Sequence, residues 1–107
     1  MSDEKPTEKV WEYDCNFTFN DQSIVKFTIT DHYQIKHSPV INNDLIGEIV
    51  NTLENQDLDP EPKKENISRD VFVWELIHYN NKKYRLVFWF KDGATNHLWI
   101  RNCYPID

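Results

Sequence analysis

Four histidines are the residues in this chain best suited to hold a metal or to transfer a proton near neutral pH. His32 and His37 are five positions apart, so they lack the i, i+4 spacing that places two metal ligands on one helix face. His78 and His97 fall on separate predicted strands, and a metal site there would require a tertiary coincidence. We therefore predict neither a metal site nor a cofactor. With two glycines in the whole chain, a glycine-rich phosphate-binding loop is excluded as well.

The two cysteines, Cys15 and Cys103, offer no nucleophile or disulfide framework. They are far apart in the chain, form no CxxC motif, and have no adjacent histidine that would stabilise a thiolate. The polar N-terminus lacks the apolar segment of a signal peptide, and no apolar run approaches the roughly 18 residues of a membrane span. We expect a soluble, cytoplasmic protein with reduced cysteines and no contact with membranes.

The charge of the chain argues against non-specific binding of nucleic acids. Its net charge is -6 and its pI is about 5.1, whereas affinity for phosphates comes largely from lysine and arginine. RNA is thus disfavoured as a general ligand, although a local basic site is compatible with this balance. An acidic surface also suits a basic protein partner.

The N-terminal third has the pattern of a β-hairpin. Apolar and polar residues alternate over 11–19, which predicts a strand with one buried face. The sequence Asn20-Asp21-Gln22 predicts a turn, and the β-branched segment 24–29 predicts the returning strand.

Two helices and a charged loop are expected next. Thr30-Asp31 can cap a short helix over 32–37, which Ser38-Pro39 would end. A cap at Asn42 or Asn43 precedes a second helix over 44–54, where the apolar residues form a single stripe. Residues 56–70 contain two prolines and eight charged residues without periodicity, so we predict a surface loop with a role in function or mobility.

Three apolar segments, 71–79, 84–90 and 97–104, predict an antiparallel three-stranded meander. The middle segment is apolar on nearly both faces, which is typical of a central strand. Strict alternation places Arg85 and Trp89 on one face. In the last segment, alternation places His97, Trp99, Arg101 and Cys103 on one face, and it places Leu98, Ile100, Asn102 and Tyr104 on the other.

These elements predict an α+β fold. It consists of an N-terminal β-hairpin, two helices and then the three-stranded antiparallel meander, forming one twisted sheet with the helices packed on one face. Residues 1–10 are expected to be a disordered tail, and residues 11–107 a single domain, because a chain of this length supports one core.

The order of elements, together with two short motifs, resembles the RelE-like toxins. Lys36-His37 stands before the main helix in DHYQIKHSPVINNDLIGEIVNTL, and Tyr104-Pro105 follows the aliphatic residues of the last strand in HLWIRNCYPID. More broadly, the chain is similar to the Barnase–EndoU–colicin–RelE group of small ribonucleases that use no metal. The resemblance covers residues 29–107, and it would make 11–107 a RelE-like domain of a toxin-antitoxin system.

The resemblance implies RNA cleavage, in which the ribose 2′-OH attacks the adjacent phosphate with the help of a base, an acid and cations. It implies His37 as base or acid, Arg85 and Arg101 as phosphate ligands, and Tyr104 as a proton donor or stacking group. Lys36 would steer the substrate. Trp89 and Trp99 lie on the same predicted face as the two arginines and are candidates for substrate binding.

A non-catalytic protein is the alternative. Arg85 and Arg101 can stack on the tryptophans in cation–π pairs without binding a substrate. Asn102 stands where the toxins often have a small hydroxyl residue, and the negative charge differs from that of the typically basic toxins. The chain would then be an acidic protein-binding module, either an antitoxin or immunity-type protein or an inactive member of the fold. The expected protein partner is a cognate antitoxin for the toxin interpretation and a basic protein for the acidic module.

Overall fold

The computed structural model describes residues 9–31, 42–62, 69–78 and 81–106 of the 107-residue chain. In chain order, the strands and helix of this part are β1 (Val10–Phe19), β2 (Gln22–Thr30), α2 (Asn43–Asn51), β3 (Phe72–His78), β4 (Lys82–Phe90) and β5 (His97–Ile106). The predicted tail over 1–10 overlaps the start of β1 at Val10. Lys9 is also described, and its carbonyl accepts a hydrogen bond from the Asp31 amide at 3.0 Å. Residues 1–8 and the helix expected over 32–37 lie outside the described residues.

All five strands belong to one sheet, in the order β1-β2-β5-β4-β3. Three of the four pairings are antiparallel, namely β1 with β2, β3 with β4, and β4 with β5. β2 and β5 are parallel, with Lys26 opposite His97 and Ile29 opposite Ile100. β5 therefore lies at the centre of the sheet, although it is the last of the five strands in the chain.

The predicted α+β class is wrong. Strands contain 57% of the described residues and helix 13%, so this part of the chain is mostly β. Within the described ranges, one helix accompanies a mixed five-stranded sheet. The predicted antiparallel meander is present as β3, β4 and β5, and the hairpin extends it through the parallel pairing of β2 with β5. β2, β4 and β5 extend beyond the predicted segments, because their backbone pairing continues past the last alternating residues, whereas β3 is slightly shorter than the predicted 71–79.

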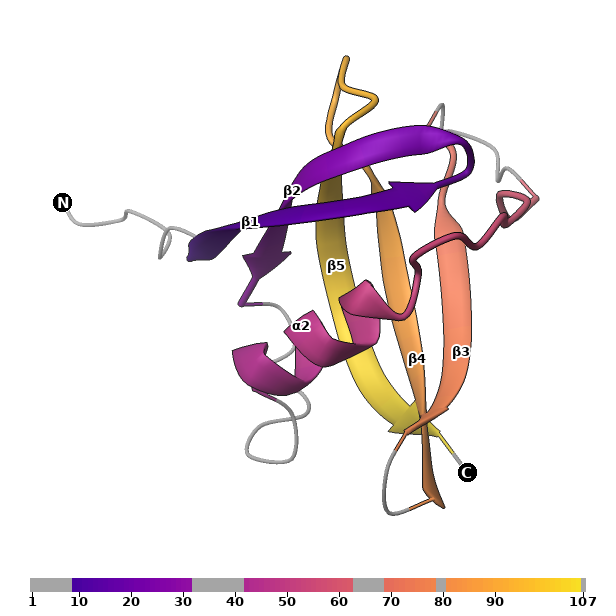
Figure 1. The fold of residues 1–107 in the computed structure, drawn as a ribbon. Helices are drawn as coiled ribbons and strands as arrows, with labels where there is room; N and C mark the ends of the chain where they lie inside the picture. The colour runs from indigo at the N-terminus through magenta and orange to yellow at the C-terminus, as the bar shows by residue number, and fades with distance from the viewer. Residues whose placement is uncertain (1–8, 32–41, 63–68, 79–80, 107) are drawn as a thin grey trace, which may run out of the picture.

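The sheet is strongly twisted. Figure 1 shows the β1–β2 hairpin crossing one end of β3, β4 and β5 at a steep angle, while α2 lies in front of the sheet on the concave side. A right-handed twist accumulates from strand to strand and curls a sheet in this way. The hairpin, the C-terminal strands and α2 thus enclose one space, which holds the hydrophobic core.

The core consists of large side chains from every element. Aromatic rings fill its sheet side, where Phe19 makes edge contacts with Phe72 and Phe88 at centroid distances of 5.5 Å. The predicted apolar stripe of α2 covers them from the other side, and Ile46, Ile49 and Val50 are fully buried. Burial of these side chains is the main force that holds α2 on the sheet.

Side-chain hydrogen bonds fix both ends of α2. The Asn42 Oδ1 atom accepts from the Leu45 backbone amide at 2.8 Å, which confirms one of the two predicted caps. At the other end, the Thr52 hydroxyl donates to the Ile49 carbonyl at 2.6 Å and accepts from the Trp74 indole nitrogen at 2.9 Å. The helix terminus is thereby tied to β3.

The charged loop after α2 is partly anchored to the hairpin. Asn20 donates to the Leu58 carbonyl at 3.0 Å and accepts from the Leu58 amide at 2.6 Å. Phe19 and Gln56 form a parallel β-bridge beside it. Asn20 and Asp21 have φ values of 51° and 62°, as a tight hairpin turn requires. The turn and the loop therefore support each other.

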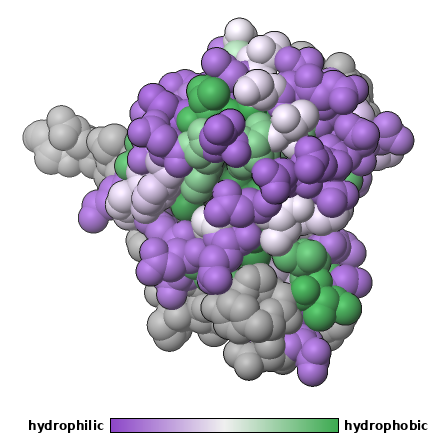
Figure 2. All heavy atoms as spheres, viewed as in Figure 1, coloured by the Kyte–Doolittle hydropathy of each residue, from purple (hydrophilic) through white to green (hydrophobic). Residues whose placement is uncertain are grey.

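Most of the surface around the helix is hydrophilic, as Figure 2 shows. In this view, most of the hydrophobic colour lies in a strip near β2 and in a patch near the far end of β3, the strand in which Ile77 is 66% exposed. Among the described residues, no helix is long and apolar enough to cross a membrane.

Candidate functional site

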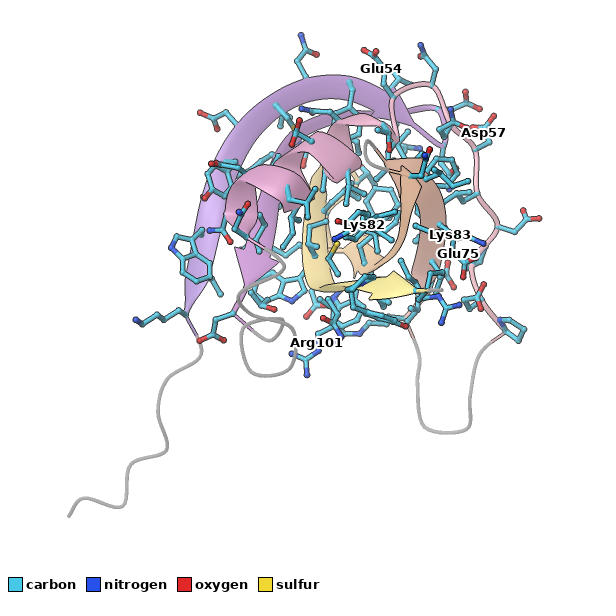
Figure 3. All side chains as sticks on the ribbon, turned by 90° about the horizontal axis from the view of Figure 1, so that it is seen from below. Glu54, Asp57, Glu75, Lys82, Lys83 and Arg101 are labelled. Atoms are coloured by element: carbon cyan, nitrogen blue, oxygen red, sulfur yellow. The ribbon has the colours of Figure 1, made fainter. Side chains whose placement is uncertain are left out.

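The face of the sheet opposite α2 carries the charged and aromatic side chains that were predicted to do chemistry. We call it the outer face and define it by Arg85, Val87 and Trp89 of β4 with Trp99, Arg101 and Tyr104 of β5. Figure 3 shows Arg101 pointing away from the sheet on the side that does not hold α2, whereas Glu54 and Asp57 lie on the helix side. No helix among the described residues covers this face.

A β-bulge in β5 decides which residues reach the outer face. Trp89 pairs with Trp99, but Val87 pairs with Asn102, so Arg101 is the additional residue on its strand. Beyond the bulge the alternation is reversed: Cys103 is fully buried in the core, and Tyr104 points outward. Strict alternation predicted Cys103 on the outer face and Tyr104 on the core face. That prediction is wrong, because the bulge shifts the register by one residue.

A cavity of about 530 Å³ opens beside the two tryptophans. Its other lining residues are charged: Arg69, Lys91, Asp92 and Arg101. Arg69 comes from the segment before β3, and its guanidinium carbon lies 4.6 Å from the centre of the Trp89 ring, in cation–π geometry. Three cations and one carboxylate therefore surround an aromatic surface.

Among the residues that the structure describes, two of the four charged side chains that line this cavity already have interaction partners within the protein, and two do not. Arg69 lies on the Trp89 ring, and Arg101 also has an interaction partner. In the described part of the chain, the Lys91 ammonium and the Asp92 carboxylate make no hydrogen bond or ion pair through their side chains. Both groups are thus available to a ligand in the cavity.

A second cavity of about 570 Å³ lies on the same face, and Glu75, Arg85, Val87 and Tyr104 are among its lining residues. Arg85 donates to Glu75 through Nε at 2.7 Å and to the Tyr104 hydroxyl through Nη1 at 3.2 Å. Lys83 lies 3.6 Å from the other oxygen of Glu75, and Figure 3 shows these two residues side by side. The cations hold this carboxylate from both sides.

These contacts change the acidity of the groups involved. The hydrogen bond from Arg85 lowers the pKa of Glu75, with smaller contributions from the charges of Arg85 and Lys83. The pKa of Arg85 is raised by its hydrogen bonds to Tyr104 and Glu75. Glu75 is therefore a poor proton acceptor at neutral pH, and Arg85 keeps its charge.

His97 begins the central strand and bonds to β2. Its Nε2 atom lies 2.7 Å from the hydroxyl of Thr28, a residue that is 1% exposed. Burial lowers the pKa of His97, the ammonium of Lys91 and the charge of Lys26 lower it further, and Glu12 opposes them. The imidazole is thus neutral at pH 7 and serves as a hydrogen-bonding group between β2 and β5.

The predicted site residues fall into three groups. Trp89, Trp99 and Arg101 line the first cavity, and Arg85 and Tyr104 line the second. The remaining two, Lys36 and His37, lie outside the described residues. Arg69 lies on Trp89, and Arg85 lies near the Tyr104 ring, at 5.7 Å from its centre, instead of on a tryptophan. The stacking of Arg101 on a tryptophan stays a prediction.

Five charged lining residues of the two cavities were not among the predicted site residues: Glu61, Arg69, Glu75, Lys91 and Asp92. Arg69 lies in a charged segment without periodicity, so no local signal distinguishes it from its neighbours. Lys91 had a usable signal, because it continues the alternation of Arg85 and Trp89 along the outer face. Across the described parts of the chain, histidine, cysteine and carboxylate side chains form no group of three that could hold a metal ion.

The chain matches no protein-family model, no curated protein and no solved structure. The resemblance to the RelE-like toxins therefore rests on the two motifs and the order of elements alone.

Proposed function

We propose that this protein binds single-stranded RNA on the outer face of its sheet. The observation that carries the proposal is the first cavity, in which Trp89 and Trp99 lie on paired positions of β4 and β5 among Arg69, Lys91 and Arg101. Aromatic rings stack on unpaired bases, and neighbouring cations neutralise the phosphates. This combination is typical of surfaces that bind single strands.

The net charge of -6 is compatible with this site, because the cations are concentrated locally. Acidic residues of the loop after α2, such as Glu54 and Asp57, lie on the other side of the sheet from Arg101 (Figure 3). A strand of RNA approaching the outer face would meet the cations of the cavity first. The acidic remainder of the surface would weaken binding elsewhere on the molecule.

We extend the proposal to cleavage of the bound RNA, on the strength of the resemblance to RelE-like ribonucleases. The 2′-oxygen would attack the phosphorus as a base takes its proton, and the bond to the 5′-oxygen would break as that oxygen receives a proton. The products are a 2′,3′-cyclic phosphate and a 5′-hydroxyl. His37 is the proposed acid or base, Arg101 the phosphate ligand, and Tyr104 a second proton donor.

Binding is tested with a labelled single-stranded RNA octamer and fluorescence anisotropy. Replacing Trp99 by Ala should weaken binding about fivefold or more, because stacking of one base contributes about 1–3 kcal/mol. Arg101→Gln should reduce the slope of log K against log salt by about 0.7, the value for one phosphate contact to a single strand. Lys82→Gln removes an exposed cation that does not line the cavity, and it should leave both quantities unchanged.

Cleavage is tested on the same RNA in the presence of a chelator, with the cyclic phosphate as the diagnostic product. The wild type should cleave, and His37→Ala and Arg101→Ala should each slow the reaction at least a hundredfold. A wild type that binds RNA but leaves it intact would refute the extension to cleavage and leave the binding site in place.

A second function is favoured by the exposed acidic residues of the loop between α2 and β3. Glu54, Asp57, Asp59 and Glu61 are all exposed, and Asn20 holds part of this loop in place. Such a surface would bind a basic protein, as an antitoxin or immunity-type module does. Capture of a basic partner that is lost on neutralising these four residues, by a protein that binds no RNA, would establish this function instead.

A further inference from the structure

We propose that Asp92 makes the first cavity selective for bases that carry an exocyclic amino group, and that uracil is therefore disfavoured there. This inference rests on the proposed binding of single-stranded RNA and names the bases that the same site would accept. The feature behind it is the single carboxylate in a cavity whose other charged groups are cations.

The backbone holds Asp92 at the rim of the cavity. Lys91 and His97 close the β4–β5 hairpin through a bond from the Lys91 amide to the His97 carbonyl at 2.9 Å. Within the turn, the Ala94 amide donates to the Lys91 carbonyl at 2.8 Å, and Gly93 has a φ of 74°. A turn of this kind, with glycine in the left-handed region, fixes the position of the residue before it.

The Asp92 side chain is not used to stabilise the turn. In the part of the chain that the structure describes, its carboxylate accepts no hydrogen bond and forms no ion pair, although Arg69, Lys91 and Arg101 line the same cavity. It remains an acceptor beside two aromatic surfaces. A base stacked on either indole would present its polar edge to such a group.

The chemistry of the base edges then decides which bases fit. A carboxylate only accepts hydrogen bonds, so it needs N–H donors on the ligand. Adenine, cytosine and guanine carry amino groups, whereas uracil presents carbonyl oxygens on both sides of its one N–H, as thymine does. A carboxylate near these oxygens would be repelled. Contacts of the three cations with phosphate would not distinguish between bases.

The discriminating experiment compares bases that stack similarly but differ in the amino group. Binding is measured with 2′-O-methyl oligonucleotides, which have no free 2′-hydroxyl and so resist cleavage. One pair is an octamer of cytidine and an octamer of uridine, and the other is a uridine octamer with one guanosine or one inosine. The wild type should bind the amino-bearing member of each pair about tenfold more tightly, the effect of one hydrogen bond to a charged group.

Asp92→Asn tests the role of the carboxylate itself. An amide both donates and accepts, so this variant should bind cytidine and uridine octamers within about twofold of each other. The ratio is the readout, because loss of a negative charge raises the affinity for every RNA. Asp21→Asn is the matched control: it removes the same charge from another hairpin turn, where asparagine also tolerates the φ of 62°, and it should keep the wild-type ratio.

The outcomes separate the two proposals. Equal ratios in the wild type and Asp92→Asn would overturn selectivity by Asp92, while RNA binding that still depends on Trp99 would stand. Absence of binding to all four oligonucleotides would overturn both. Loss of discrimination in the Asp21 variant as well would assign the effect to net charge and overturn the role of Asp92.

Discussion

Glu75 and Arg85 lie directly opposite each other on β3 and β4. Both Nε and Nη2 of Arg85 contact the same carboxylate oxygen of Glu75, at distances of 2.7 and 2.6 Å. The remaining guanidinium nitrogen reaches the Tyr104 hydroxyl on β5. A single side chain thus connects three neighbouring strands on the outer face. This role limits what Arg85 can do for a ligand, because its strongest hydrogen-bonding positions are already occupied.

The Glu75–Arg85 pair should make the stability of the protein depend on acid pH. The pKa of Glu75 is lowered from 4.5 in the folded state, so its contribution to stability is present above about pH 4.5. This contribution to stability is lost as the pH falls through the pKa that Glu75 has in the folded protein. Glu75→Gln should flatten this decline, as measured by urea denaturation between pH 3 and 7. Glu54→Gln, an exposed loop control, should retain the wild-type slope, and a decline that is equally steep in Glu75→Gln would contradict the assignment.

His97 should cause a second decline at higher pH. Because its pKa is lowered from 6.5 by burial, the folded state binds the proton more weakly than the unfolded chain does. Stability from neutral His97 is present above about pH 6.5 and is lost as the pH falls through the folded-state pKa. The imidazole signals in an NMR titration should report that lowered pKa directly. A titration midpoint above 6.5 would refute the prediction.

Thr52→Val should destabilise the protein by about 1–2 kcal/mol, although valine has nearly the same shape. The substitution removes the acceptor of the Trp74 indole N–H, and a partly buried donor without a partner costs about this much. Urea denaturation gives the free energy of unfolding. Thr18→Val, at an exposed position of β1, makes the same chemical change and should alter stability by less than about 0.5 kcal/mol.

Neither thiol should react readily with a thiol reagent in the folded protein. Burial raises the pKa of Cys103 to about 12, and burial together with the nearby Asp14 raises that of Cys15 to about 11. At pH 8 both therefore remain protonated, and the thiolate is the reactive form. A colorimetric thiol assay should detect slow labelling of the half-buried Cys15 first, and both cysteines only after unfolding. Rapid labelling of Cys103 in the native state would show that the core packing around it is wrong.

Local signals were sufficient for the N-terminal hairpin, the cap at Asn42 and the core stripe of α2. In each of these cases the information lies within about ten residues, as a period, a turn or a capping side chain. The parallel pairing of β2 with β5 has no such signal. It joins residues such as Thr28 and His97, which are 69 positions apart, and their hydrogen bond becomes visible only in the folded chain.

The candidate site was predictable to a similar extent. Alternation correctly put Arg85 and Trp89 on one face of β4, and Trp99 and Arg101 on the same side of the sheet in β5. It misplaced Tyr104, because the bulge at Arg101 adds a residue that periodicity cannot anticipate. Arg69 reaches Trp89 from a loop, and loop residues carry no period at all.

The central position of β5 has a consequence for how the chain acquires its fold. The β1–β2 hairpin and the β3–β4 hairpin have no backbone pairing with each other, and both depend on the strand that is synthesised after them. Until His97–Ile106 has been made, the growing polypeptide holds two separate hairpins with an exposed apolar side. Folding should therefore be slow for a sheet of this size, since its decisive contact closes a loop of nearly seventy residues.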